Sequence, residues 1–252
     1  MSEFPPTSRY NRRNKLTAIV AACAINFGAS ACVAAVEAPV AAQTEAPSID
    51  FEKETVRVTT EQVLRSLGSL AITGRAPKTG YSPEQFGSWR QKDGCDTRDV
   101  ILIRDLDGIT LNSVTCEVLT GTLVDPYSGE VVPFERGENS GDVQIDHVVS
   151  RSNAWQMSPP EFRSDTKAAY QNRVDFANDP VNLRAVKGEM NNEKSDGDIA
   201  TWEPPKKDFL CEFAAQQVIV KDKYNLRVTQ AEHDTFVQIL TTCPNEEFAI
   251  PN

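Results

Sequence analysis

The chain has 252 residues, of which 40% are hydrophobic, a length and composition that suit one folded domain with appended segments. Its formal net charge is −10, and without the first 31 residues 22 basic residues stand against 35 acidic ones, a net charge of −13. Tight non-specific binding to a polyanion depends on Lys and Arg side chains that neutralise phosphates, so this balance argues against a stable nucleic-acid binder. It argues less against an enzyme that releases its substrate and uses a divalent cation.

Residues 1–31 have the layout of a secretory signal peptide. A basic stretch precedes an apolar run at residues 16–28, which is too short to span a bilayer, and Ala29-Ser30-Ala31 supplies a small-residue cleavage site. Cys32 or Cys23 could instead carry a lipid, as in bacterial lipoproteins. We therefore predict a secreted, extracellular protein. A lipid anchor at the cell surface is the alternative, and it would be the protein's only contact with a membrane.

The mature chain is predicted to begin with a tether. Residues 32–58 are rich in Ala, Pro, Val and Glu without a period, which is typical of a disordered acidic segment. The folded domain is predicted at residues 59–252. Thr59 or Thr60 is suited to cap its first helix, and Ser82-Pro83-Glu84-Gln85 has the Ser cap and the early Pro of another helix start.

Short strands are predicted in the middle of the chain. Residues 117–124 and 130–134 flank the turn-rich pentad Asp125-Pro126-Tyr127-Ser128-Gly129, so we expect them to pair. Further strands are predicted at residues 142–149 and 181–186. The pattern indicates an α+β fold with a small antiparallel sheet.

Helices are predicted on both sides of the last strand. Residues 153–175 are helix-like with an interruption at Pro159-Pro160, and residues 187–195 suit a helix or a turn. Residues 207–224 carry apolar side chains at helical spacing, and the capping box Thr229-Gln230-Ala231-Glu232 opens a last helix.

Four cysteines lie in the body of the chain, namely Cys95, Cys116, Cys211 and Cys243. None forms a Cys-x-x-Cys pair, which argues against a structural zinc site. In an exported chain they indicate two disulfides, for which three connectivities exist. We favour Cys95–Cys116 with Cys211–Cys243, because each of these bonds closes a local loop.

The candidate functional residues begin with Asp146 and His147, an acid–imidazole pair at the end of a predicted strand. Asp146 could bind a hard cation through oxygen, while His147, with an ordinary pKa near 6.5, could take a proton from water. Neighbouring side chains in a strand point to opposite faces, so both serve one substrate only if the strand ends there, as Ser150-Arg151-Ser152-Asn153 indicates. Carboxylate and amide oxygens favour Mg²⁺, Mn²⁺ or Ca²⁺. Four downstream asparagines could supply the amide oxygen: Asn178, Asn182, Asn191 and Asn192.

The ordered set of Asp146-His147, Asn182-Leu183, Asn191 and Lys194 resembles the His-Asn-His (HNH) endonucleases, whose site is a ββα-metal motif. More closely, the chain is similar to an exported HNH-type family of actinobacteria that shares a domain with the GmrSD-type restriction nucleases. The resemblance extends over roughly residues 75–245. It also includes the segments 81–87, 94–98, 118–123, 176–183 and 191–198.

The resemblance implies a role for each matched residue. Asp146 would be the first metal ligand, and His147 would be the general base that activates water against a phosphodiester. Asn182 would hold the loop of the motif and orient His147. Asn191 would be the second metal ligand, with Asn192 as the alternative.

Positive side chains would bind the substrate. The resemblance makes Lys194 a phosphate contact, and we expect Arg151 and Arg184, with Arg173 and Lys187, to form a basic rim interleaved with acidic residues. The resemblance implies a ββα-metal core with additional helices, one divalent ion (Mg²⁺ first, then Mn²⁺ or Ca²⁺), a DNA substrate with RNA as a second one, and no stable protein partner. The alternatives are an inactive cell-surface binding protein on the same fold and a phosphoesterase for small nucleotides.

Overall fold

The computed structural model describes residues 55–92, 94–243 and 247–252. The predicted signal peptide, the candidate lipid sites Cys23 and Cys32, and most of the predicted tether lie outside the described residues. The described part is an α+β fold with small antiparallel sheets, as the sequence predicted. No helix in it combines the length and the apolarity that crossing a membrane requires.

The first described strand pairs with the last. Strand β1 (Thr55–Thr59) runs antiparallel to β9 (Glu247–Pro251), and the side chains of Phe248 and Ile250 are buried beneath this ribbon. The prediction of a disordered tether up to residue 58 is therefore wrong for residues 55–58. The prediction failed because the partner strand lies almost two hundred positions away.

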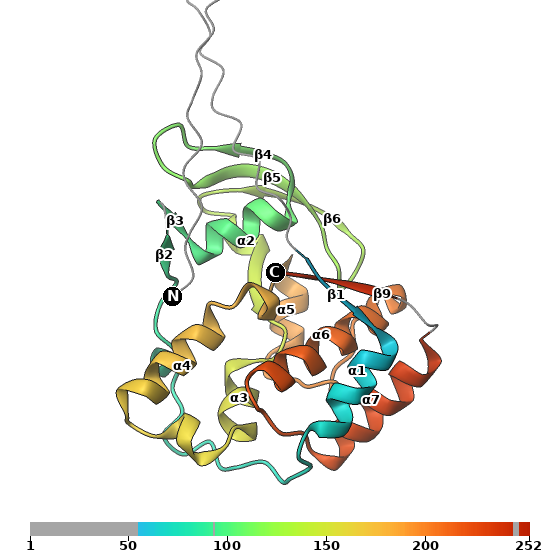
Figure 1. Cartoon of the computed structure of the whole chain (residues 1–252). Coiled ribbons are helices and arrows are strands. Elements are labelled where there is room, and N and C mark those ends of the chain that lie inside the picture. Colours follow the sequence, from blue (N-terminus) through green and yellow to red (C-terminus); the bar gives the residue numbers. More distant parts are fainter. Residues whose placement is uncertain (1–54, 93, 244–246) are drawn as a thin grey trace, which may run out of the picture. The chain divides into compact units, whose positions relative to one another are not determined.

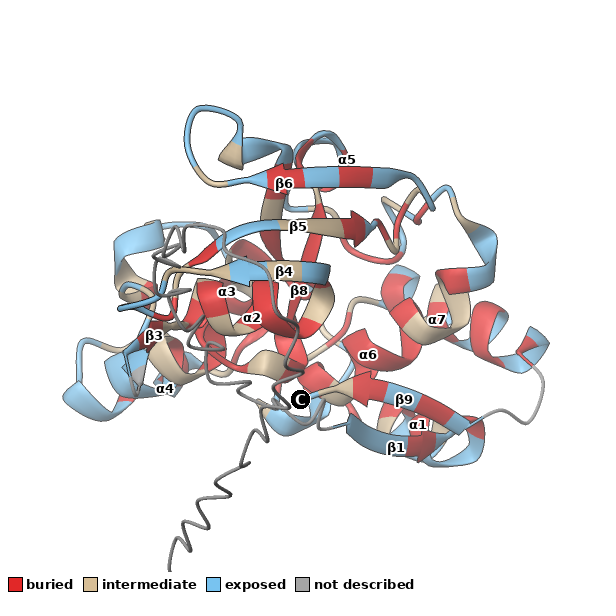
Figure 2. Ribbon diagram, turned by 90° about the horizontal axis from the view of Figure 1, so that it is seen from above, coloured by how far each residue is buried: buried red, intermediate tan, exposed pale blue. Residues whose placement is uncertain are grey.

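Three helices pack beside this ribbon. Thr59 caps α1 (Thr60–Ser69) with a capping box, and α1 contacts both α6 (Leu210–Lys223) and α7 (Gln230–Thr242) (Figure 1). The predicted capping box at Thr229 is present at the start of α7. The disulfide Cys211–Cys243 joins the start of α6 to the end of α7, with 5.9 Å between the Cα atoms. Val63, Phe213, Phe236 and Leu240 form part of a fully buried core between these helices (Figure 2).

A three-stranded antiparallel sheet covers the other hydrophobic cluster. It consists of β4 (Asp107–Leu111), β5 (Val118–Val124) and β6 (Val131–Glu135), and helix α2 (Thr97–Asp105) belongs to the same cluster. The predicted pairing around the pentad at residues 125–129 is confirmed as β5–β6. Asp107 and Gly108 open β4. The second predicted disulfide, Cys95–Cys116, is also present.

The strand–strand–helix unit that the resemblance implied lies between these parts. Strand β7 (Val143–His147) pairs antiparallel with β8 (Leu183–Lys187), and α5 (Gly188–Lys194) follows directly. The long connection between the strands contains α3 (Arg151–Met157) and α4 (Lys167–Ala177). The remaining elements are β2 (Gln91–Lys92), β3 (Cys95–Asp96) and the 3-10 turns Pro83–Phe86, Ser140–Asp142, Pro160–Arg163, Pro180–Asn182 and Lys207–Phe209. The expected helix at Ser82 is thus a single 3-10 turn.

Candidate functional site

A pocket of about 280 Å³ lies where β7 ends beside α5. Strand β7 stops at His147, and Ser150 then caps α3 by accepting a hydrogen bond from the backbone N–H of Asn153. This break in the strand allows two neighbouring side chains to reach one pocket. The pocket is lined by Ile145, Asp146, His147, Arg151, Asn191, Asn192, Ser195 and Asp196.

Asp146 is a buried carboxylate at the floor of this pocket, and both of its oxygens already accept hydrogen bonds. The ammonium of Lys194 donates to Oδ1 at 2.9 Å, and the hydroxyl of Tyr127 donates to Oδ2 at 2.5 Å. Burial and the neighbouring carboxylate raise the pKa of Tyr127 well above its ordinary value, so its hydroxyl stays protonated and can donate. The carboxylate is thus fixed in orientation from two sides.

Lys194 is buried, whereas a phosphate contact requires an exposed ammonium. Its side chain is 0% exposed, and its ammonium also donates to the backbone carbonyl of His147 at 3.0 Å. The expectation of a direct phosphate contact is therefore corrected: this ammonium lies beneath the pocket and pairs with Asp146. The sequence could not indicate this, because a lysine at the end of a short helix is usually solvated.

The imidazole of His147 is held from three directions. Its ring stacks on Trp89 with 5.7 Å between ring centroids and lies nearly parallel to the ring of Phe176 at 6.5 Å. Its Nε2 atom lies 3.0 Å from the carbonyl oxygen of Ala177. A carbonyl oxygen can only accept, so Nε2 carries the proton in the neutral ring and Nδ1 remains as the acceptor.

The surroundings of His147 keep its ring neutral. Burial, mainly, and the nearby Arg151 guanidinium lower the pKa of His147 to about 4, and the attraction of Asp146 offsets this only in part. The residue is half-buried, and two aromatic rings lie nearly parallel to its imidazole. At neutral pH the imidazole can therefore accept a proton. An ordinary histidine base would lose activity below about pH 6. For His147 we expect this loss at a lower pH.

Asn182 lies behind the pocket and is fully buried. Its side chain accepts a hydrogen bond from the backbone N–H of Val149 at 2.8 Å and donates one to the carbonyl of the same residue at 3.2 Å. It thereby holds the segment that follows His147. None of the recorded contacts of Asn182 reaches the His147 ring, which is oriented by Ala177, Trp89 and Phe176 instead.

Asn191 faces the pocket from α5, and its orientation is set by β7. Its side-chain amide donates to Oε1 of Gln144 at 2.8 Å, which leaves its own Oδ1 as the remaining acceptor. Gln144 can lie here because residue 188 is glycine: a Cβ on Gly188 would approach the Gly141 carbonyl to 2.3 Å and Nε2 of Gln144 to 2.9 Å. Asn192 also lines the pocket but is exposed. The side chain of Asn191 is held in place, so its oxygen is the better candidate to bind a metal ion.

Arg151 is the only Lys or Arg residue among the side chains that line the pocket. It opens α3 and has no ion pair within 4 Å in the described residues, so its guanidinium can meet an anion. The carboxylate of Asp196 lies at the same pocket and pairs with Lys78 at 2.7 Å. The pocket thus has one accessible cation.

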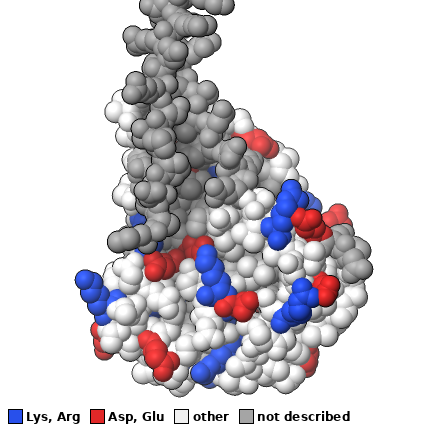
Figure 3. Space-filling view, viewed as in Figure 1, with Lys and Arg blue, Asp and Glu red and all other residues white. Residues whose placement is uncertain are grey.

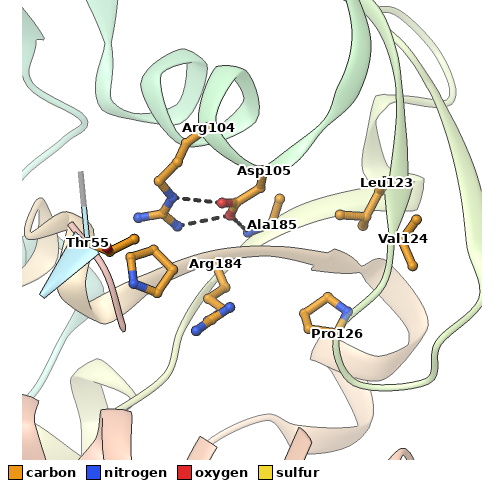
Figure 4. A pocket seen from close by; sticks show the side chains of 9 residues that line it. Thr55, Arg104, Asp105, Leu123, Val124, Pro126, Arg184 and Ala185 are labelled. Atoms are coloured by element: carbon orange, nitrogen blue, oxygen red, sulfur yellow. Dashed lines mark hydrogen bonds and ion pairs between the residues drawn. The ribbon is translucent and has the colours of Figure 1, made fainter. Parts of the chain in front are cut away.

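Arg184 does not belong to this pocket, which corrects its predicted role in binding substrate there. It faces Asp146 across the β7–β8 register, but its guanidinium lies over the ring of Phe209 and pairs with Glu212. It lines a separate pocket of about 240 Å³ that also contains the Arg104–Asp105 ion pair (Figure 4).

The expected basic rim is also absent among the described residues. Arg173 is buried and donates to backbone carbonyls, including that of Phe162, while Lys187 pairs with Glu130 and Glu189. On the face seen in Figure 3, positive and negative side chains are interspersed and no continuous basic area is visible.

Four side chains that shape the site were missed in the sequence. Trp89 and Phe176 enclose the imidazole, Tyr127 holds Asp146, and Gln144 holds Asn191. Tyr127 carried a weak signal, since it lies in the predicted turn at residues 125–129. The others lie far from the motif or within an ordinary strand pattern, and nothing local marks them.

Comparison with known proteins gives two matches. The family model described as "GmrSD restriction endonucleases, C-terminal domain" matches residues 96–239. A protein of Arthroderma benhamiae described as "Uncharacterized secreted protein" is 32% identical over 180 residues, which cover 70% of this chain and 82% of that protein. No solved structure matches the chain. The relative is fungal, so nothing here supports the expected actinobacterial origin.

Proposed function

The chain belongs to the family of the C-terminal domain of GmrSD restriction endonucleases, and from this premise we propose that it is a secreted, metal-dependent endonuclease. Its proposed reaction is hydrolysis of phosphodiester bonds in DNA, with RNA as a second substrate. One observation carries the proposal. A single pocket holds an oriented carboxylate (Asp146), an oriented amide (Asn191) and a neutral imidazole (His147).

His147 is proposed as the general base. The Ala177 carbonyl fixes the proton on Nε2, so Nδ1 would accept the proton of the attacking water. The stacked rings of Trp89 and Phe176 keep the imidazole in one plane. Asn182 acts in this proposal as a positioning residue, because it holds the backbone at Val149.

The donors at the pocket suit a hard divalent cation. Asp146 and the Oδ1 atom of Asn191 are oxygen donors, and Mg²⁺ keeps several waters when it binds to few protein ligands. The described residues contain no group of three or more His, Cys, Asp or Glu side chains able to hold a metal, which argues against a zinc-type site there. A bound Mg²⁺, or Mn²⁺ or Ca²⁺ in its place, would stabilise the negative charge that develops on the phosphate.

Arg151 is proposed as the substrate contact, since its guanidinium can bind a phosphate oxygen at the pocket. The proposal includes export, because the fungal relative is described as secreted and two disulfides suit an oxidising compartment. No observation supports a lipid anchor, and no stable protein partner is proposed.

A plasmid-nicking assay tests the proposal. The wild-type chain is expected to nick supercoiled DNA with Mg²⁺ or Mn²⁺ and to lose this activity in EDTA. His147→Ala should lower the rate at least about a hundredfold. The matched control is His233→Ala, which changes the other histidine, on α7 and outside the pocket. If wild type and His147→Ala leave DNA and RNA equally intact with every metal, the nuclease proposal fails.

A phosphoesterase for small nucleotides is the second candidate. It is favoured by the net charge of −10 and by the single cation among the pocket-lining residues, which suit a small anion better than a long polyanion. Bis(4-nitrophenyl) phosphate separates the two candidates. Rapid hydrolysis of this small diester by a chain that leaves plasmid and RNA intact would establish the second function.

A further inference from the structure

The carboxylate proposed to hold the metal ion already has a cationic partner. The ammonium of Lys194 lies 2.9 Å from Oδ1 of Asp146, and the two side chains are 0% and 5% exposed. An ion pair shielded from water interacts strongly, so the negative charge of Asp146 is matched before a cation arrives. The hydroxyl of Tyr127 further satisfies Oδ2.

The other carboxylate of the pocket is matched as well. Asp196 pairs with Lys78, leaving Arg151 as the charge at the pocket without an ion-pair partner in the described residues. Before any ligand binds, the pocket is therefore suited to an anion. A divalent cation entering alone would approach Lys194 and Arg151, whose positive charges would repel it.

We propose that the pocket takes up its divalent cation together with an anionic phosphate group, and that Lys194 and Arg151 cause this coupling. A phosphate group supplies negative charge to the cation and to Arg151 at once, which offsets the repulsion that a lone cation meets. By thermodynamic reciprocity, the cation must tighten phosphate binding by the same factor. This inference rests on the proposed metal-dependent function and deepens it.

Removing the Lys194 charge has two opposing effects on cation affinity. It deletes a hydrogen bond that orients Asp146, and outer partners of metal ligands typically change affinity about 10- to 100-fold. It also deletes the repulsion between an ammonium and a divalent cation bound to the same carboxylate. Tyr127 still holds Oδ2, so the orienting effect is partly retained. Repulsion in a site shielded from water is the larger effect, and we expect a net gain in affinity of about tenfold.

Mn²⁺ binding to the full chain, followed by electron paramagnetic resonance, tests the coupling without any activity measurement. The probe for the anion is thymidine 3′,5′-bisphosphate, with its own Mn²⁺ binding measured without protein. In wild type the nucleotide should tighten Mn²⁺ at least about tenfold. In Lys194→Met, Mn²⁺ alone should bind about tenfold tighter than in wild type, and the effect of the nucleotide should shrink. Lys187→Met is the control: it removes a positive charge at the end of β8, away from Asp146. This variant should bind Mn²⁺ as tightly as wild type, with and without nucleotide.

Arg151→Gln provides a variant that does not disturb a buried ion pair. It should bind Mn²⁺ alone more tightly than wild type and lose most of the tightening by nucleotide; it decides the question if Lys194→Met does not fold. The inference is overturned if wild type binds Mn²⁺ equally with and without nucleotide, or not at all. It is also overturned if the folded variants bind Mn²⁺ alone no tighter than wild type. Coupling in a chain that cleaves no nucleic acid would remove the proposed nuclease function alone. Cleavage without coupling would remove this inference alone.

Discussion

The side-chain amide of Asn191 donates to Oε1 of Gln144 across 2.8 Å, and this bond joins α5 to β7 beside the pocket that Asn191 lines. Gln144 therefore decides which way the amide of Asn191 points. Without this contact the amide could rotate and present its NH₂ group to the pocket in place of its oxygen.

Gln144→Ala should raise the Mg²⁺ concentration for half-maximal nuclease activity about tenfold, because the amide oxygen is no longer held. The maximal rate at saturating Mg²⁺ should fall much less. The measurement is the initial rate of plasmid nicking as a function of Mg²⁺ concentration. A merely structural role would lower the maximal rate and the unfolding temperature without shifting the Mg²⁺ requirement, so that result would contradict the prediction.

The pH dependence of activity should differ from that of an ordinary histidine base. Burial and Arg151 lower the pKa of His147 to about 4, and a nearby cation would lower it further, so the base remains neutral at pH 5 to 6. We expect initial rates to stay level from pH 7 to about pH 5 and to fall near pH 4. Circular dichroism at each pH separates protonation from unfolding. A loss of activity centred near pH 6.5 in a folded chain would show that the imidazole is solvated.

Trp89 should control that same pKa. Its ring covers one face of His147, so Trp89→Ala exposes the imidazole to water and should raise the pKa of His147 towards the ordinary 6.5. The acid limb of the rate profile should then move to higher pH. Trp89→Phe keeps an aromatic ring over the imidazole and should retain most of the wild-type profile. Identical profiles for wild type and Trp89→Ala would remove Trp89 from this role.

A buried ion pair that does not line the pocket should govern acid stability. Glu232 and Lys221 are both 0% exposed and lie 3.0 Å apart between α6 and α7. Burial opposes ionisation of Glu232, but the ammonium of Lys221 and hydrogen bonds from Thr229 and Asn153 outweigh it and lower the pKa of that carboxyl. The group therefore stabilises the fold above the pKa of an unfolded glutamate and loses this effect as pH falls through the lower folded value.

The unfolding temperature of wild type should accordingly fall as the pH is lowered from 5 to 3. Lys221→Met leaves Glu232 buried without its cation, which should destabilise the fold by about 3–5 kcal/mol at neutral pH. Thermal unfolding measures the first effect and chemical denaturation the second, both followed by the tryptophan signal. Lys223→Met, on the same helix with a half-exposed side chain, is the control and should change stability by at most about 1 kcal/mol. Equal losses in the two variants would contradict the prediction.

Local pattern was sufficient for much of the architecture. Helix caps, the pentad at residues 125–129 and helical spacing predicted α1, β5, β6 and α7 correctly, because neighbouring residues determine each of them. Strands β1 and β9 were missed since the strand-pairing partner of each lies at the opposite end of the described chain. Both disulfides that we favoured among the three connectivities are present.

The pocket, like the fold, could be predicted only in part. Asp146, His147 and Asn191, which the resemblance singled out, line it together with Arg151, and their roles stay predictions. The directions of long side chains could not be predicted. Lys194 turns inward to a carboxylate, and Arg184 turns to Phe209 although its strand neighbour across the register is Asp146.

The β1–β9 ribbon has a consequence for the order of events in synthesis. Arg57 and Glu247, which pair across it, are 190 positions apart, so the ribbon cannot form until residue 247 has emerged. Contacts of such separation form late and slowly, because the intervening chain must first be ordered. The side chains of Phe248 and Ile250 would therefore join the core only after helices α1, α6 and α7, which precede them in the chain, have been synthesised.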